Sequence, residues 1–269
     1  MPHTASTHAH HDQLSRLLDL DAIIHRSVTE RAVRALARHA RKADVTTVLD
    51  IGAGTGAGLF ALATEFEDAE LVAIDLDERM LDDIRGRAGR QGLGGRITSL
   101  RADVGERLFD AGDADVIWSS NALHEVPDPA LALANMFRSL RRGGVLAIVE
   151  MVAPPLVLPS EHASLETLLR LAAGADRNAP DWTTDITAAG FELLETRTLT
   201  SGQRLAADGP GGAYAALELR RLAQHAQPEL SDESARSIRE IIADLSGEHR
   251  LIERVHVRGA RALWIARRP

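Results

Sequence analysis

Cysteine is absent from the 269 residues, which excludes disulfide bonds, thiolate metal sites and a cysteine nucleophile. Aromatic residues make up only 3% of the chain, so few side chains could stack on the bases of single-stranded nucleic acid. Lysine is almost absent as well, because Lys42 is the only one and arginine supplies nearly all of the basic charge. These shortages remove several classes of redox, metal and nucleic-acid chemistry from consideration.

A positive net charge is also missing, since the formal net charge is -8. Duplex nucleic acid is bound mainly through its phosphates and needs a positive protein face. No apolar run approaches the ~20 residues that a membrane span needs, and the first residues lack a basic-then-apolar signal pattern. We therefore expect a cytoplasmic protein that binds neither nucleic acid nor membranes. A monomer and a homodimer both stay open.

The first twelve residues are polar and contain four histidines, His3, His8, His10 and His11. One interpretation is a metal-binding tract, and the other is a disordered tail of biased composition. The loose spacing favours the disordered tail over residues 1–12. We expect no metal site in the chain.

Hydrophobic residues reach 45%, enough for a sizeable core, and from Val45 short apolar runs alternate with helical patterns. This alternation predicts an α/β fold that is Rossmann-like, with a seven-stranded, mostly parallel sheet and helices on both faces. The predicted strands cover residues 45–51, 71–75, 96–102, 115–119, 144–150, 191–199 and 260–266. The predicted intervening helices cover residues 57–66, 77–91 and 128–140, the last with Asp128 as cap and Pro129 at its first position.

Apolar spacing over residues 14–41 predicts one or two helices, which would form an N-terminal helical cap at residues 13–44. The main domain then spans residues 45–269. Three prolines, Pro154, Pro155 and Pro159, are expected to end the fifth strand. We expect lid elements at about 154–182 and 200–246, the second with a turn-rich connection (200–210) and helical insertions near the C-terminus (214–226 and 232–245). For the segment at about 154–182, a plain surface helix is the alternative to a lid.

The strongest motif runs from Asp50 through Gly52, Gly54, Gly56 and Gly58, directly after a buried strand and at the start of a helix. Glycine tolerates the backbone angles of a sharp turn, and its missing side chain lets a ligand approach the backbone. The helix that follows offers free N–H groups to an anionic group. Alone, this turn indicates only a nucleotide-like cofactor, because nicotinamide enzymes also have one, usually spaced Gly-x-Gly-x-x-Gly.

Two acids end the next two strands. Asp75 follows the turn by ~20 residues, where an acid can accept hydrogen bonds from ribose hydroxyls of either cofactor. Asp103 ends the third strand, where a side-chain acceptor can meet the exocyclic amine of adenine. The position of Asp103 favours an adenosyl cofactor over a nicotinamide one.

With these motifs in order, the chain over about 45–150 resembles the class I S-adenosylmethionine-dependent methyltransferases of the small-molecule type. The segments that carry the likeness are 48–56, 72–77, 102–104, 115–126 and 140–149. The segment from Leu123 to Asp128 is similar to the Leu-His-x-Val-Pro-Asp pattern of many small-molecule methyltransferases. It departs from the Asn-Pro-Pro-Tyr pattern typical of enzymes that methylate nucleic-acid bases.

The resemblance implies S-adenosyl-L-methionine as the cofactor and assigns its contacts residue by residue. Gly52, Ala53 and Gly54 would lie against its methionine and ribose, and Asp50 would support the turn near its amino group. Asp75 would hold the ribose hydroxyls. The remaining expected contacts are Leu76 and Met80 beside the adenine, Asp103 and the Val104 backbone at its amine, and Ser119, Ser120 and Asn121 near the methionine.

If the acceptor is a hydroxyl, a base must remove its proton. His124 is the first candidate because histidine titrates near neutrality, Glu125 is the second, and His162 is a third. A structural hydrogen bond that fixes the loop is the alternative role for His124. Arg26 could pair with the cofactor carboxylate, since arginine recognises carboxylates bidentately, or could simply be exposed.

The expected function is therefore transfer of a methyl group from S-adenosylmethionine to a small molecule such as a secondary metabolite. Two alternatives stay open at this point, namely an NAD-dependent Rossmann oxidoreductase and a non-catalytic protein that keeps the cofactor fold. The sequence indicates neither the acceptor nor whether oxygen, nitrogen or carbon is methylated. Trp182 could line the acceptor pocket or pack in the core.

Overall fold

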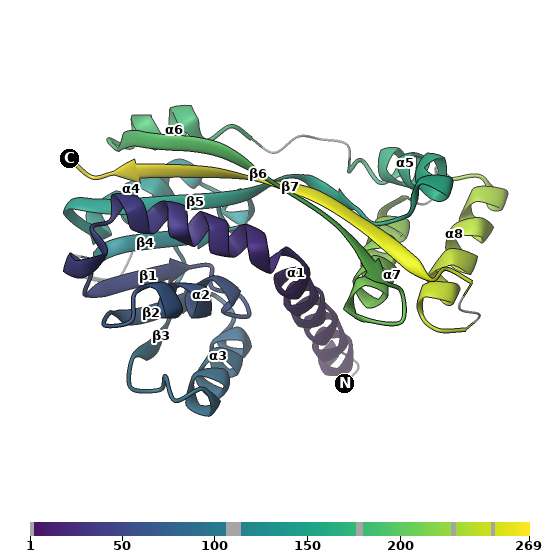
Figure 1. Cartoon of the computed structure of the whole chain (residues 1–269), viewed down its shortest axis with the longest axis horizontal. Coiled ribbons are helices and arrows are strands. Elements are labelled where there is room, and N and C mark those ends of the chain that lie inside the picture. The colour runs from purple at the N-terminus through teal and green to yellow at the C-terminus, as the bar shows by residue number, and fades with distance from the viewer. Residues whose placement is uncertain (1–2, 106–113, 176–179, 227–229, 249–250) are drawn as a thin grey trace. The chain divides into compact units, whose positions relative to one another are not determined.

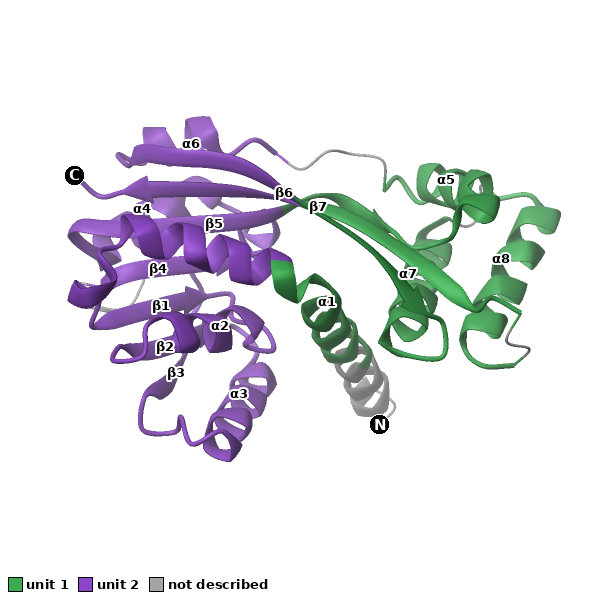
Figure 2. Ribbon diagram, in the orientation of Figure 1, with its two compact units in different colours: residues 1–27, 151–178, 200–260 green, residues 28–150, 179–199, 261–269 purple. Residues whose placement is uncertain are grey.

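The computed structural model describes residues 3–105, 114–175, 180–226, 230–248 and 251–269, with side chains from residue 13 onward. The chain forms two compact units (Figure 2). Unit 1 contains residues 1–27, 151–178 and 200–260, and unit 2 contains residues 28–150, 179–199 and 261–269. Each unit is therefore assembled from three separate stretches of sequence.

One seven-stranded sheet has the strand order β3-β2-β1-β4-β5-β7-β6 (Figure 1). The strands from β3 to β5 in this order pair in parallel. Gly144 pairs with Arg268 and Val157 pairs with His256 through backbone hydrogen bonds, so β7 runs opposite to β5. The Rossmann-like, mostly parallel sheet is confirmed. Its strands are β1 (Thr47–Ile51), β2 (Glu70–Asp75), β3 (Ile97–Arg101), β4 (Ala114–Ser120), β5 (Leu140–Leu156), β6 (Glu192–Ala206) and β7 (Arg254–Arg267).

Helices cover both faces of the sheet in unit 2, because alternate strand residues point to opposite sides. On β4, Val116 and Trp118 pack in one core cluster with α1, α2 and α3, whereas Ile117 packs in the other with α4 and α6. Asp128 caps α4 through a bond from the Leu131 N–H, with Pro129 in its first turn, as predicted. The helices are α2 (Ala57–Glu65), α3 (Glu78–Arg90), α4 (Pro129–Ser139) and α6 (Thr183–Ala188).

The N-terminal cap is a single helix, α1 (His3–His39), followed by the short turn η1 (Lys42–Asp44). Residues 3–12, for which the composition predicts a disordered tail, are the first turns of this helix. A helix adds residues to an existing end far more easily than it starts, which favours this extension. Residues 3–27 of α1 belong to unit 1, and the rest belongs to unit 2.

Unit 1 adds helices around its own apolar cluster, which includes Leu169, Tyr214 and Ile238. The predicted helices near the C-terminus are present as α7 and α8. The described helical elements of this unit, besides α1, are η3 (Ser160–His162), α5 (Ala163–Ala172), α7 (Pro210–Ala226) and α8 (Asp232–Leu245), and in unit 2 η2 (Leu123–Glu125) completes the set.

Three predicted strand limits are wrong. The last strand, β7, begins at Arg254 and not at residue 260. Residues 200–206 continue β6 instead of forming a turn-rich connection, and the exposure of this stretch alternates, as a strand requires. Pro154 and Pro155 lie inside β5 and do not end it. Both prolines come after Val149, the last β5 residue paired with β4, so no ladder bond to β4 is lost there.

Two charged side chains of α5 hold the end of β5. The buried carboxylate of Glu166 accepts the N–H groups of Val157 and Leu158, at 2.6 and 3.1 Å. The guanidinium of Arg170 donates to the carbonyl oxygens of Pro154 and Pro155. These two side chains therefore satisfy four backbone groups of residues 154–158.

Replacing Glu166 by glutamine should destabilise the protein by on the order of 3 kcal/mol, because the amide leaves a buried N–H group without an acceptor. Chemical denaturation measures this loss. The matched control is Glu233→Gln on the exposed first turn of α8, which should change the free energy of unfolding by less than about 0.5 kcal/mol. Equal stability of the two variants would disprove the role given to Glu166.

Candidate functional site

The glycine-rich turn between β1 and α2 lies at the carboxyl end of the parallel strands in unit 2. The N–H groups of Gly52 and Ala53 both donate to the Ile74 carbonyl of β2, at 2.9 and 3.1 Å. Gly52, Gly54 and Gly56 have φ angles of +69°, +51° and +83°, which L side chains rarely adopt. The turn therefore requires glycine for its backbone shape.

At Gly52 the missing side chain also makes room for the protein itself. A Cβ atom on Gly52 would lie 2.3 Å from the Cβ of Ala122, in the loop that follows β4. A Cβ atom on Gly58, at the start of α2, would lie 2.5 Å from Nε1 of Trp118. The alternating glycines thus let α2 and the loop after β4 pack directly on the turn.

Asp75, at the end of β2, is hydrogen-bonded to the turn. Its Oδ2 accepts the Gly54 N–H at 2.8 Å, and its Oδ1 accepts the Asp77 N–H at 3.0 Å. The side chain is half-buried, and each oxygen keeps a second lone pair for a further donor. Asp103 is similar, because its Oδ1 accepts the Gly105 N–H at 2.7 Å after the end of β3. Both predicted acids are therefore acceptors at the same sheet edge.

Asp50 is buried in β1, and its Oδ2 has no hydrogen-bond partner. Burial, reinforced by the nearby charge of Asp75, raises the pKa of Asp50 from 3.8 to about 7. An ionised carboxylate held in this way is costly unless a donor reaches it. The site therefore favours a ligand with a cationic or N–H donor at this point.

Two further buried oxygen atoms near this edge have no partner, namely Oγ of Ser119 and Oδ1 of Asn121. Ser119 is paired with Ile51 of β1, and Asn121 follows the end of β4 in a left-handed conformation with φ +51°. Buried polar atoms are normally bonded, and exceptions in a fold often mark a site for a polar ligand.

His124 is held by an acid that we did not single out from the sequence, Glu150 at the carboxyl end of β5. One oxygen of the buried Glu150 carboxylate lies 2.6 Å from Nδ1 of His124. The other accepts the N–H groups of Ala122 and Leu123, at 3.2 and 2.9 Å. The available signal was an acid at the end of a predicted strand, as for Asp75.

The hydrogen bond to Glu150 raises the pKa of His124, with burial opposing the shift. The exposed Glu125 lies 3.1 Å from Nε2 of His124 and acts in the same direction. Both ring nitrogens therefore face carboxylates, which favours the doubly protonated imidazolium. His124 can accept a proton only at pH values above this raised pKa.

The structure places the other predicted residues as follows. Leu76 is exposed, Met80 is buried on α3, and the Val104 carbonyl accepts the side-chain amide of Asn135. Trp182 packs in a core cluster of unit 2. Arg26, on the exposed side of α1, and His162 both belong to unit 1, whereas all the other predicted cofactor and catalytic residues belong to unit 2.

Two negative findings concern the described part of the chain. No three histidine or acidic side chains in it are grouped as a metal ion would require. None of its helices is both long enough and apolar enough to cross a bilayer.

Comparison with known proteins supports the sequence motifs directly. Residues 48–144 match a family model described as "Methyltransferase domain". A demethylmenaquinone methyltransferase of Clavibacter sepedonicus is 31% identical over 176 residues, which cover 58% of this chain and 69% of that protein. A ubiquinone/menaquinone biosynthesis C-methyltransferase of Dinoroseobacter shibae is 30% identical over 58% of this chain and 70% of that protein. A 27-O-demethylrifamycin SV methyltransferase of Amycolatopsis mediterranei is matched over only 39% of its length, at 30% identity.

Two solved structures share the fold at low sequence identity. The YcgJ protein from Bacillus subtilis superposes with a TM-score of 0.53 at 18% identity, over 88% of this chain and 99% of that one. The (4+2)-cyclase SpnF superposes with a TM-score of 0.55 at 19% identity, over 89% and 81% of the two chains. Because SpnF is described as a cyclase, the fold alone does not fix the reaction.

Proposed function

Because the chain belongs to the class I S-adenosylmethionine-dependent methyltransferases, we propose that unit 2 holds S-adenosylmethionine along the glycine turn and that the protein methylates a small organic molecule. The observation that carries this proposal is the hydrogen bond from the Gly54 N–H to Asp75, which links the turn to the end of β2. Buried oxygen atoms of Asp50, Ser119 and Asn121 that have no partner among the described residues lie at the same edge of the sheet. The comparisons support neither the nicotinamide-dependent alternative nor the non-catalytic one.

The chemistry of the site fits this cofactor. Its α-ammonium group is a donor for the buried Asp50 carboxylate and for the side-chain oxygen of Asn121. The remaining lone pairs of Asp75 suit ribose hydroxyls, and the free Oδ2 of Asp103 suits the adenine amine. We propose the further contacts of Ala53, Leu76, Met80, Val104, Ser119 and Arg26 on the likeness to the family.

When bound, S-adenosylmethionine supplies an electrophilic methyl group on its sulfonium. The protein then has to orient the acceptor and exclude water, and positioning alone can supply ~7–11 kcal/mol. We propose that His124, held by Glu150, accepts the proton of the acceptor, with Glu125 as the second candidate. The segments 154–182 and 200–246 remain our proposed source of acceptor contacts.

Incubation with methyl-labelled S-adenosylmethionine and a library of small phenols, carboxylic acids and amines tests the function. We expect label in at least one small product together with S-adenosylhomocysteine. Asp75→Ala should lose this turnover, and Asp82→Ala, an exposed acid on α3, should keep it. Label transfer by wild type and Asp75→Ala at equal rates would contradict the proposed site.

Cofactor affinity should rise as the pH increases from about 6 to 8. A carboxylate whose pKa is about 7 is half protonated at neutral pH, and only its ionised form can pair with the cofactor ammonium. Calorimetry with S-adenosylhomocysteine should show this gain in wild type and little of it in Asp50→Asn. A pH-independent wild-type affinity would remove Asp50 from the proposed contacts.

A further inference from the structure

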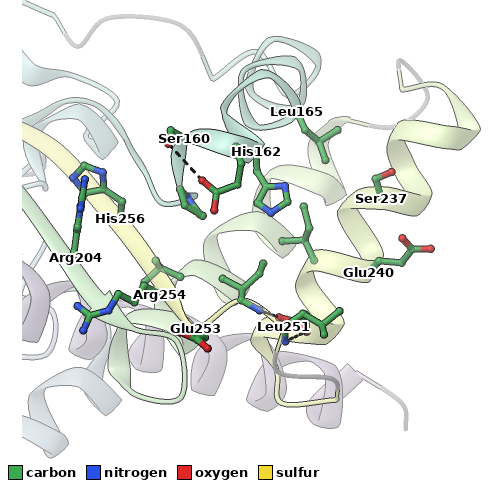
Figure 3. A pocket seen from close by; sticks show the side chains of 16 residues that line it. Ser160, His162, Leu165, Arg204, Ser237, Glu240, Leu251, Glu253, Arg254 and His256 are labelled. Atoms are coloured by element: carbon green, nitrogen blue, oxygen red, sulfur yellow. Dashed lines mark hydrogen bonds between the residues drawn. The ribbon is translucent and has the colours of Figure 1, made fainter.

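Unit 1 contains a pocket of about 1120 Å³, most of it lined by the segments proposed above to supply acceptor contacts (Figure 3). It is lined by residues of η3, α5, β6 and α8, by residues 251–253, which lead into β7, and by residues 254–256 of β7 itself. All of these belong to unit 1, whereas the glycine turn, Asp75 and His124 belong to unit 2. The volume is slightly above the roughly 300–1,000 Å³ of typical sites for small organic ligands, so such a ligand would fit.

Three basic side chains lie on the side of the pocket that β6 and β7 form, which we call the strand side. Arg204 comes from β6, and Arg254 and His256 lie two residues apart on β7, so both side chains emerge from the same face of that strand. Figure 3 shows Arg204 and His256 next to one another, with Arg254 nearby. The sheet itself therefore fixes the spacing of these three groups.

No described carboxylate lies within ion-pair distance of Arg204 or Arg254. Burial lowers the pKa of His256, and the charges of Arg258 and Arg204 lower it further. This direction is expected where positive charge is not balanced by acids. The strand side of the pocket is thus electrostatically suited to an anion.

The pocket is also lined by four acids, none of which forms an ion pair with Arg204 or Arg254 in the described part of the chain. Asp244 accepts the N–H groups of Leu251 and Ile252, at 2.6 and 2.7 Å, and so fixes the chain that leads into β7. Glu161 accepts a long bond from Ser160, at 3.4 Å. Glu240, on α8, lies across the pocket from Arg204 and His256 in Figure 3, and Glu253 is exposed.

Apolar side chains supply a further part of the surface, beside Ser160, His162 and Ser237. Leu165 of α5, Ile241 of α8 and Val255 of β7 line the pocket, and Ile241 and Val255 are almost fully buried. Pockets that combine apolar walls with a few convergent polar groups are the usual form of small-molecule sites.

We propose that this pocket is a binding site for a small organic anion with an apolar body, whose acidic group lies on Arg204, Arg254 and His256. Carboxylate, sulfonate and phosphate groups share the acceptor chemistry that guanidinium groups recognise. An acceptor of this class would rest on the proposed function, but the site uses only residues of unit 1, so ligand binding to it can be measured without methyl transfer.

A matched pair of fluorescent probes tests the proposal. 8-Anilinonaphthalene-1-sulfonate carries an apolar ring system and a sulfonate, and N-phenyl-1-naphthylamine has the same rings without the charge. Titration of the full chain with each probe should show tighter binding of the sulfonate. The double variant Arg204→Gln/Arg254→Gln should weaken sulfonate binding by at least about tenfold and leave the neutral probe unchanged.

The control double variant is Arg236→Gln/Arg239→Gln, on the exposed side of α8 and outside the pocket, which should bind both probes as wild type does. Leu165→Trp fills part of the pocket and should weaken both probes. Equal sulfonate binding by the pocket double variant and wild type would overturn the proposal. An equal loss in the control variant would also overturn it, because general surface charge would then explain the binding.

Discussion

Replacing Gly52 by alanine should weaken binding of S-adenosylhomocysteine by at least about a hundredfold. The new Cβ would lie 2.3 Å from the Cβ of Ala122, and Gly52 has a φ angle of +69°. Relief of this overlap requires movement of the turn that carries the Gly54 N–H to Asp75 or of the loop that leads to His124. Isothermal calorimetry measures the affinity, and circular dichroism verifies that the variant is folded.

Two variants separate the overlap from backbone strain. Gly143→Ala is the matched control, because Gly143 has a φ angle of +81° with nothing within 4 Å of its new Cβ. It should lose about 1–2 kcal/mol of stability and no cofactor affinity. Adding Ala122→Gly to Gly52→Ala removes the second methyl group and should restore most of the binding. No recovery in this double variant, or no loss in Gly52→Ala, would refute the packing argument.

Replacing Glu150 by glutamine should lower the pKa of His124 and change its tautomer. The amide can still accept the N–H groups of Ala122 and Leu123 through its oxygen, but its NH₂ group then faces Nδ1 of His124. Nδ1 becomes an acceptor, so the proton of the neutral ring moves to Nε2. Because the side chain of His124 is 39% exposed and the backbone bonds to residue 150 are kept, the loss of stability should be small, about 1–2 kcal/mol.

Nitrogen-15 NMR of the histidine ring reports both the pKa and the tautomer. Because the pKa of folded His124 is raised, wild type should lose stability as the pH rises through that pKa, and Glu150→Gln should lose this dependence. Glu125→Gln is the control, since Glu125 is exposed and should shift the pKa of His124 less. If Glu150→Gln left the titration of His124 unchanged, Glu150 would not be its positioning residue. If His124 is also the catalytic base, Glu150→Gln should lower kcat and leave KM nearly unchanged.

The parallel half of the fold was predictable from the sequence because its signals are local. Apolar runs ended by Gly52, Asp75 and Asp103 located three strand ends, and Asp128 with Pro129 located the start of α4. The strand extensions were missed because β6 beyond Leu199 alternates weakly between small and polar residues. Pro154 and Pro155 mimic a strand end, and the bonds from Arg170 and Glu166 to this stretch come from more than ten residues further along the chain than the prolines.

Site residues were predictable from the sequence where a fixed position in the fold, such as the turn after β1 or the end of β2, calls for one particular residue type. Gly52 and Asp75 are examples, although the structural reason for Gly52 is contact with Ala122 and not only access for a ligand. Glu150 was missed because its partners Ala122, Leu123 and His124 are distant in sequence and meet it only across β4 and β5. The pocket of unit 1 joins residues from 159 to 256, a grouping that no linear motif indicates.

The central claim is that the glycine turn of unit 2 binds an adenosyl cofactor, and titration of the wild-type chain with S-adenosylhomocysteine and, separately, with NADH tests it most directly. We predict a saturable one-to-one isotherm with S-adenosylhomocysteine that Asp103→Ala weakens, and no comparable heat with NADH. Saturable binding of NADH without binding of S-adenosylhomocysteine would contradict the account.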